Sequence, residues 1–127
     1  MIALPPYADL LGLRIDGADD GAPVLLMPFH DDVIGRPGFL HGGAIGGLLE
    51  MAAIAALQCA FSDGDRPRIK PITVTVDYMR GGRDHDTRAV GAITRLGNRI
   101  ANIEATAWQD DRARPIAVAR MNILLVR

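Results

Sequence analysis

The chain has 127 residues, of which 49% are hydrophobic, and its 14 basic and 15 acidic residues give a net charge of -1. This is the length of one ordinary domain, so we expect a single domain over residues 1–127. The near-neutral balance argues against a nucleic-acid-binding protein that relies on a broad positive field. Because the N-terminus lacks the basic and apolar regions of a secretory signal, we expect a cytoplasmic location.

Short elements come first along the chain. The pattern of residues 7–11 predicts a short helix that ends at Gly12. Residues 22–29 are typical of a strand, and its two prolines, Pro23 and Pro28, indicate either an edge strand or the ends of the strand. A loop rich in turn-forming residues follows.

A long apolar helix is predicted over residues 42–61. Glu50 is the only charged residue between His41 and Asp63. A helix that is apolar on nearly every face is stable only when the rest of the protein wraps it, so we expect Glu50 to be partly removed from water. Glu50, Gln58 and four glycines argue against a membrane span, although the length would suffice.

Cysteine and histidine residues point to neither a disulfide nor a metal. The single cysteine, Cys59, lies within the apolar helix, where we expect a small buried hydrophobic side chain. His30 and His85 fall in predicted loops without partners at the spacing of metal ligands, so we expect no metal site.

An alternating pattern replaces the helical one in the second half of the chain. The apolar residues that alternate with polar ones, and so predict a half-buried strand, are Ile72, Val74, Val76 and Tyr78. Further strands are predicted at residues 87–96, 99–109 and 115–126, with a tight Gly97-Asn98 hairpin between the first two. Short connections predict an antiparallel sheet curved around the one long helix, an α+β fold.

The run His41-Gly42-Gly43 opens the long helix. A helix start presents backbone N–H groups without partners, so these amides are suited to bind an anion or a developing oxyanion. Glu50 lies about 10 Å farther along the axis, too far to meet a group bound at the first amides easily. Two such helices packed antiparallel about a two-fold axis would bring Glu50 of one chain near Gly42 of the other. The structural alternatives are a simple tight turn at His41-Gly42-Gly43 and a Glu50 that pairs with a basic residue of the sheet or lies at a subunit interface.

These residues resemble a known family. His41-Gly42-Gly43, with Gly38 three residues before the histidine and an acid nine residues after it, is similar to the hotdog-fold acyl-CoA thioesterases of the phenylacetic-acid-degradation type. The resemblance covers nearly the whole chain and includes Leu11-Gly12-Leu13, residues 74–80, residues 97–101 and residues 108–110. It implies a hotdog fold, dimers with sheets joined edge to edge, and often tetramers.

The resemblance also implies roles for individual residues. The Gly42 amide would polarise the thioester carbonyl, and Glu50 from the facing subunit would act as nucleophile or as general base toward water. His41 would shape the site through hydrogen bonds to the loop, and Gly43 and Gly38 would help bind the substrate. No cofactor is implied beyond the coenzyme A portion of the substrate.

Two positions depart from the family pattern. Gly35 stands where many members carry Asn or Gln, with Arg36 beside it as a candidate replacement, and Ile54 stands where some members carry a hydroxyl. For the phosphates of coenzyme A we nominate three arginines near the predicted sheet ends and turns: Arg80, Arg83 and Arg99.

Hydrolysis of an acyl-CoA thioester without a metal is therefore the first hypothesis. A non-catalytic acyl-CoA binder or assembly module is the second, because Gly35 lacks the polar side chain. A hotdog hydratase or dehydratase is less favoured, because those enzymes pair the helix acid with a histidine about fourteen residues upstream, where this chain has Arg36.

Overall fold

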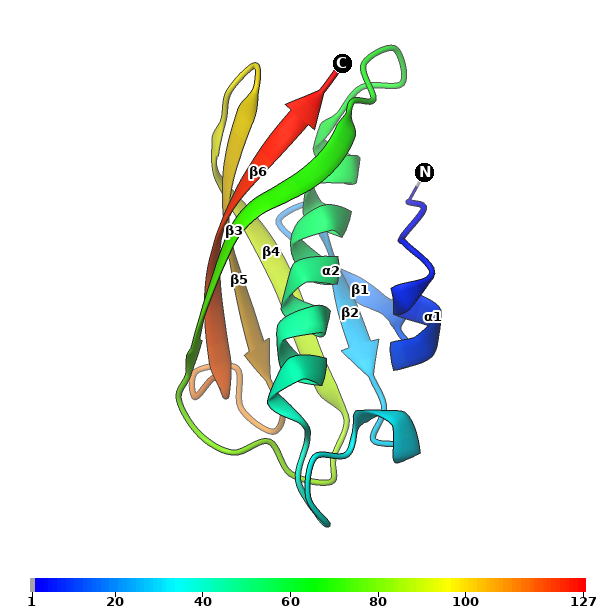
Figure 1. Ribbon diagram of the computed structural model, residues 1–127, viewed down its shortest axis with the longest axis vertical. Coiled ribbons are helices and arrows are strands. Elements are labelled where there is room, and N and C mark those ends of the chain that lie inside the picture. The colour runs from blue at the N-terminus through cyan, green and yellow to red at the C-terminus, as the bar shows by residue number, and fades with distance from the viewer. Residues whose placement is uncertain (1) are drawn as a thin grey trace.

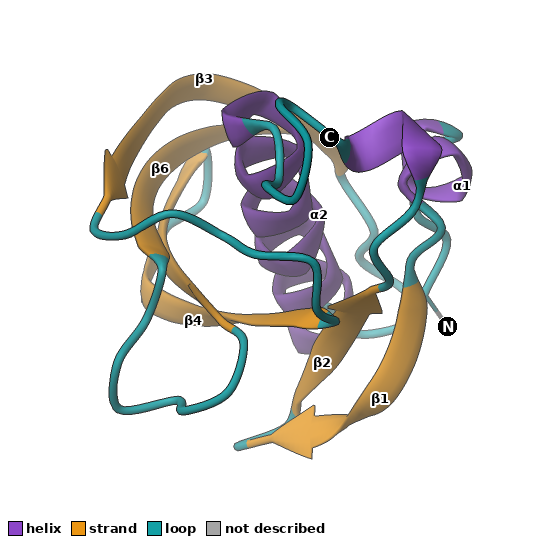
Figure 2. Cartoon of the chain, turned by 90° about the horizontal axis from the view of Figure 1, so that it is seen from below, coloured by secondary structure: helices purple, strands orange, loops and turns teal. Residues whose placement is uncertain are grey.

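A computed structural model describes residues 2–127. Its strands are β1 (Arg14–Asp19), β2 (Ala22–Met27), β3 (Arg68–Tyr78), β4 (Thr87–Leu96), β5 (Ile100–Trp108) and β6 (Ala117–Val126). Its helices are α1 (Tyr7–Leu11), the short 3-10 helix η1 (Asp31–Val33) and the long α2 (Gly42–Ala60). The strands form one antiparallel sheet in the order β1-β2-β4-β5-β6-β3, and this sheet curves around α2 (Figures 1 and 2). The predicted hotdog architecture is confirmed.

Small side chains let the sheet approach α2 closely. Gly91 of β4 is buried against the helix, and a methyl group there would lie 2.8 Å from the Ala52 carbonyl oxygen and 3.0 Å from the Ala53 Cα. The two backbones therefore touch, which fixes the helix against the sheet. By length and hydropathy α2 would suit a membrane span, but 61% of that window is buried inside the protein.

Strand β1 is missing from the sequence prediction. Its residues carry no apolar alternation and are almost all exposed, and Gly17 takes a φ of 89° beside an irregular register between Ile15 and Ala18. Pairing with β2 holds this strand in place. Because β1 and β4 flank β2 on its two sides, the edge-strand interpretation of Pro23 and Pro28 is wrong, and these prolines instead mark the strand ends.

Three smaller predictions also need correction. Strand β3 begins at Arg68 rather than at residue 72, and an irregular register after Pro71 interrupts its pairing with β6. The connection between β4 and β5 has three residues, 97–99, rather than two. Cys59 is exposed rather than buried, because it lies near the end of α2 and borders an open cavity beside β4 and the β1–β2 turn.

The apolar row of β3 is open in the single chain. Ile72 is 58% exposed, Val74 is 38% exposed and Tyr78 is 55% exposed, although the alternation predicts a half-buried strand. Of the four apolar residues, only Val76 is half-buried as predicted, and it packs against the core. β3 is the last strand of the sheet, so one of its edges has no neighbour. The alternation therefore marks an apolar surface that only another molecule can cover.

Candidate functional site

His41 is the N-cap of α2. Its Nδ1 accepts a hydrogen bond of 2.8 Å from the Gly43 N–H. An N-cap side chain satisfies one of the N–H groups that a helix start leaves without an intrahelical partner. The His41 side chain thus bonds to the helix itself, while the expected hydrogen bond to the loop is made by the His41 backbone N–H, which donates to the Val33 carbonyl at 2.8 Å. The Gly43 amide is already engaged and is a poorer oxyanion donor than its neighbour.

The Gly42 amide is the available donor at this terminus. Among residues 2–127, no group accepts a hydrogen bond from its N–H, whereas Ala44 and Ile45 both donate to the His41 carbonyl. The Gly42 carbonyl accepts a hydrogen bond of 2.8 Å from the Tyr78 hydroxyl. This bond ties the first turn of α2 to the end of β3. The Gly42 N–H shares a peptide plane with the His41 carbonyl, so the bonds from Ala44 and Ile45 to that carbonyl hold the N–H in a fixed direction.

Tyr78 is a site residue that the sequence prediction missed. Besides its hydrogen bond to Gly42, its ring lies 3.5 Å from where a methyl group on Gly42 would stand, and its hydroxyl lies 3.5 Å from where one on Gly46 would stand. The glycines of the first turns therefore leave just enough room for this ring. Its place in the alternating strand marked Tyr78 as apolar packing and gave no sign of the bond to the helix.

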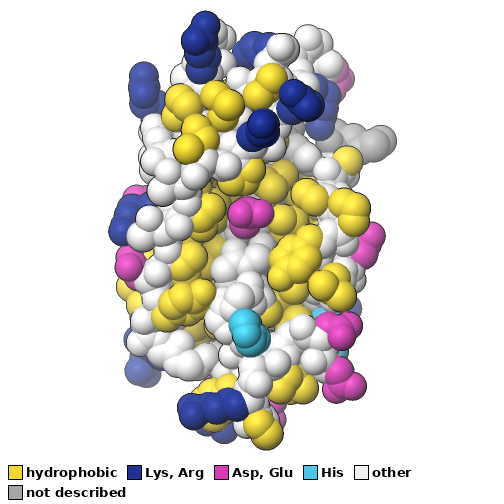
Figure 3. Space-filling view, viewed as in Figure 1, with side chains coloured by type: hydrophobic (Ala, Val, Ile, Leu, Met, Phe, Trp, Pro, Cys, Tyr) yellow, Lys and Arg dark blue, Asp and Glu magenta, His cyan; other side chains and the backbone are white. Residues whose placement is uncertain are grey.

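Glu50 lies about 12 Å along α2 from Gly42, two turns into the helix. It is half-buried, as predicted, and no residue within 2–127 forms a hydrogen bond or ion pair with its carboxylate. One turn earlier, Gly47 packs under α1, where a methyl group would meet the Tyr7 ring at 2.6 Å. Hydrophobic side chains gather over the face that α2 presents (Figure 3). The carboxylate thus borders an apolar surface with its acceptor sites unused.

The loop before the helix explains why residue 35 is glycine. A methyl group on Gly35 would lie 2.9 Å from the His41 Cα and 3.2 Å from the His41 nitrogen. The Phe39 N–H donates to the Arg36 carbonyl at 2.9 Å, and Gly38 has a φ of 81°, as a type II turn with proline at its second position requires. No polar side chain fits at Gly35, and Gly38 serves the turn.

Arg83, nominated for the phosphates of coenzyme A, meets Arg36 at this loop. The guanidinium of Arg36 lies 4.1 Å from the centre of the Phe39 ring, and that of Arg83 lies 4.2 Å from the same ring. Arg80 is exposed just after β3, where its N–H contacts the Ile116 carbonyl at 3.2 Å.

Arg99 does not join this group. It lies in the β4–β5 connection, at the end of the molecule opposite the start of α2 (Figure 1). Ile54, which stands where some members of the resembled family carry a hydroxyl, is buried in the core at 5% exposure. It therefore offers no polar group to the site.

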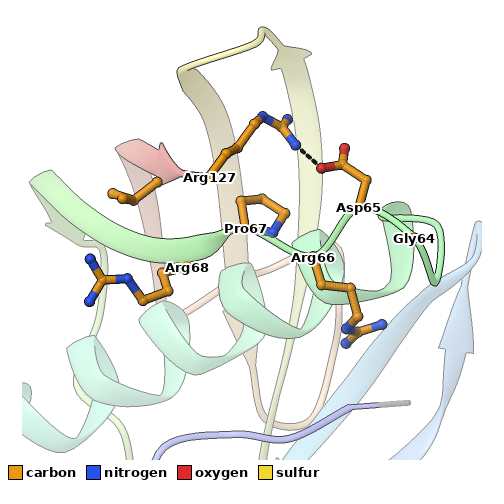
Figure 4. A pocket seen from close by; sticks show the side chains of 7 residues that line it. Gly64, Asp65, Arg66, Pro67, Arg68 and Arg127 are labelled. Carbon is orange, nitrogen blue, oxygen red and sulfur yellow. Dashed lines mark hydrogen bonds and ion pairs between the residues drawn. The ribbon is translucent and has the colours of Figure 1, made fainter.

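Two cavities lie away from the helix start. One of about 420 Å³ is lined by Gly64, Asp65, Arg66, Pro67, Arg68, Val126 and Arg127, with an ion pair between Arg127 and Asp65 (Figure 4). The other, of about 480 Å³, lies beside the β1–β2 turn and is bordered by Cys59, Glu104 and Arg112. Within residues 2–127, no cluster of three or more His, Cys, Asp or Glu side chains is suited to a metal. Neither of these two cavities is lined by Gly42 or Glu50.

A family model described as the thioesterase superfamily matches residues 37–116. The matched range contains the turn at Gly38, the start of α2 and Glu50.

Named relatives agree with this match. Thioesterase PA1618 from Pseudomonas aeruginosa, solved as a mutant, superposes with a TM-score of 0.80 at 28% identity, over 94% of this chain and 85% of its own. Medium/long-chain acyl-CoA thioesterase YigI from Salmonella typhimurium is 26% identical over 122 residues, covering 84% of this chain and 77% of the relative. BH2602 from Bacillus halodurans, solved with CoA, is similar in fold, with a TM-score of 0.83 at 21% identity over 95% of this chain and 78% of its own.

Proposed function

Since the chain belongs to the thioesterase superfamily, whose reaction is the hydrolysis of thioesters, we propose that its substrate is an acyl-CoA. The products are a free carboxylic acid and coenzyme A. The observation that carries this proposal is the unengaged Gly42 amide at the start of α2, with the unpaired Glu50 carboxylate on the same helix. The relative from Salmonella typhimurium acts on acyl-CoA, and the structure of BH2602 contains CoA, which supports a CoA-type substrate.

The Gly42 N–H donates to the thioester oxygen and stabilises the negative charge that this oxygen gains in the tetrahedral intermediate. Glu50 acts in one of two ways. As general base it takes a proton from the attacking water, and as nucleophile it forms an anhydride that water then hydrolyses. In both routes the C–S bond breaks, and the leaving thiolate takes up a proton. His41 and Tyr78 act on the position of the donor, through the Gly43 N–H and the Gly42 carbonyl.

The two groups belong to different chains. The oxyanion and the attacked carbon share one bond, so a donor and a carboxylate about 12 Å apart along one helix cannot readily serve the same thioester. A second copy whose α2 runs antiparallel to the first supplies Glu50 to the Gly42 of its partner. The open edge of β3 and its exposed row, which includes Ile72, Val74 and Tyr78, provide the surface for such pairing.

A thiol-release assay with acyl-CoA substrates of increasing chain length tests the proposed activity. We expect turnover with at least one of them, and calorimetry on the same panel reports binding. Tight binding without thiol release from any substrate would instead favour the non-catalytic binder, which the absence of a polar side chain at Gly35 supports.

A mixture of two inactive variants tests the shared site. In a mixed dimer of Glu50→Gln and Gly42→Pro chains, one site keeps both the intact amide and the intact carboxylate. Random exchange of chains is therefore expected to restore about a quarter of the wild-type rate. If both groups came from one chain, mixing would restore nothing. The pure variants, carried through the same denaturation and refolding, are the controls.

A further inference from the structure

The loop before α2 and the loop after β3 are joined around one aromatic ring. Both guanidinium groups lie over the Phe39 ring: that of Arg36 is 4.1 Å from the ring centre, and that of Arg83 is 4.2 Å from it. The type II turn brings Arg36 and Phe39 together, because they are its first and last residues and share the hydrogen bond that closes it. Cation–π attraction then holds both guanidinium groups at the ring.

Both loops are also fixed through their backbones. The Leu40 N–H donates to the Gly82 carbonyl at 2.9 Å. The Gln109 side chain accepts from the Arg83 N–H at 2.9 Å and donates to the Arg83 carbonyl at 3.0 Å. The two arginines are therefore carried on a pre-formed support, which lowers the entropy that a ligand must overcome to order them.

Neither guanidinium is neutralised by the protein. Within residues 2–127, no carboxylate lies within ion-pair distance of Arg36 or Arg83. The nearby acids Asp84 and Asp110 contact His85 instead, at 3.7 Å and 3.3 Å. Two like charges held at one ring repel each other, so a bound anion would relieve an unfavourable arrangement. Arginine is the side chain best suited to phosphate oxygens.

We propose that Arg36 and Arg83, stacked on Phe39, bind the phosphate groups of coenzyme A. This inference rests on the proposed acyl-CoA substrate. Phe39 is three residues before Gly42, a span of at most about 11 Å of chain, and the arginines reach outward from it. The two arginines thus lie outside the reacting centre, at the same end of the molecule as Gly42. In acyl-CoA the pantetheine arm likewise separates the phosphates from the thioester.

The test compares an acyl-CoA with a truncated thioester of the same acid, which lacks the phosphate-bearing nucleotide and most of the pantetheine arm. The variants are Arg36→Gln, Arg83→Gln and the double variant, which keep a planar side chain and lose the charge. For an acyl-CoA that the wild type hydrolyses, we expect KM to rise about three- to tenfold for each single variant and more for the double, with kcat little changed. For the N-acetylcysteamine thioester of the same acid, kcat/KM is expected to stay at the wild-type value.

The matched control is Arg95→Gln, an exposed arginine of β4 without an ion pair, which is expected to leave both substrates unaffected. An equal loss on both substrates would overturn the proposal, since it would mean that the arginines only support the loop. An unchanged KM for acyl-CoA in the double variant would overturn it as well.

Binding of free coenzyme A, measured by calorimetry, separates this proposal from the proposed activity. If the wild type hydrolyses neither substrate yet binds coenzyme A, and the double variant binds it about tenfold or more weakly, phosphate binding by Arg36 and Arg83 is supported although the proposed hydrolysis fails. If the wild type and the double variant bind coenzyme A equally well, phosphate binding by Arg36 and Arg83 is rejected, whatever the catalytic result.

Discussion

Replacement of Glu50 by glutamine is expected to lower thiol release from acyl-CoA by about a hundredfold or more, the scale of a lost general acid–base or nucleophilic group. The amide matches the carboxylate in shape but can neither take a proton from water nor attack the thioester carbon. Since no residue within 2–127 pairs with Glu50, the substitution is expected to leave the thermal midpoint and acyl-CoA binding close to wild type. Steady-state thiol release, thermal unfolding and calorimetry measure the three quantities.

Glu104→Gln is the matched control, because Glu104 is the only other glutamate of the chain and is exposed on β5. It is expected to retain full activity. Full turnover by Glu50→Gln would refute the role of that carboxylate, and a similar loss in both variants would point to net charge instead.

Replacement of Gly42 by proline is expected to reduce kcat by about 10² to 10³ while the protein still folds. Proline has no N–H, so the variant removes the oxyanion donor itself. It fits the first position of a helix, and the preceding His41 already has φ -69° and ψ 133°, which suit a residue before proline. The single-turnover rate and the unfolding midpoint together separate lost catalysis from lost structure.

Gly42→Ala provides the comparison that keeps the donor. Its added methyl group would lie 3.5 Å from the Tyr78 ring, an ordinary contact distance. The alanine variant is therefore expected to stay active. If the alanine and proline variants lost activity equally, the space at Gly42 rather than its N–H would govern the reaction.

Neighbouring residues carry most of what the sequence predicts correctly about the site. His41, Gly42 and Gly43 are adjacent, so the start of the helix and the free Gly42 amide follow from local chemistry. The half-burial of Glu50 follows from the absence of any other charge in its helix. The sheet order β4-β5-β6 follows equally from short connections between alternating strands.

Contacts between distant segments carry what the sequence does not reveal. The bond from Tyr78 to Gly42 spans 36 residues, and the Arg83–Phe39 contact depends on how two separate loops close. The reason for glycine at Gly35 is a collision with the His41 backbone, which appears only when the turn is formed. The periodicity of apolar residues indicates which face of a helix or strand is buried, but it does not indicate which loops contact each other.

The order of elements along the chain bears on synthesis. Of the strands, only β1 and β2 precede α2, and β4, β5 and β6, which complete its cover, follow it. A 19-residue helix with the hydropathy of a membrane span therefore leaves the ribosome before most of the sheet exists. Exposed apolar segments of incomplete chains associate with one another, and chaperones commonly bind them. The tendency of this protein to aggregate is thus expected to depend on the order in which its elements are synthesised rather than on the stability of the finished fold.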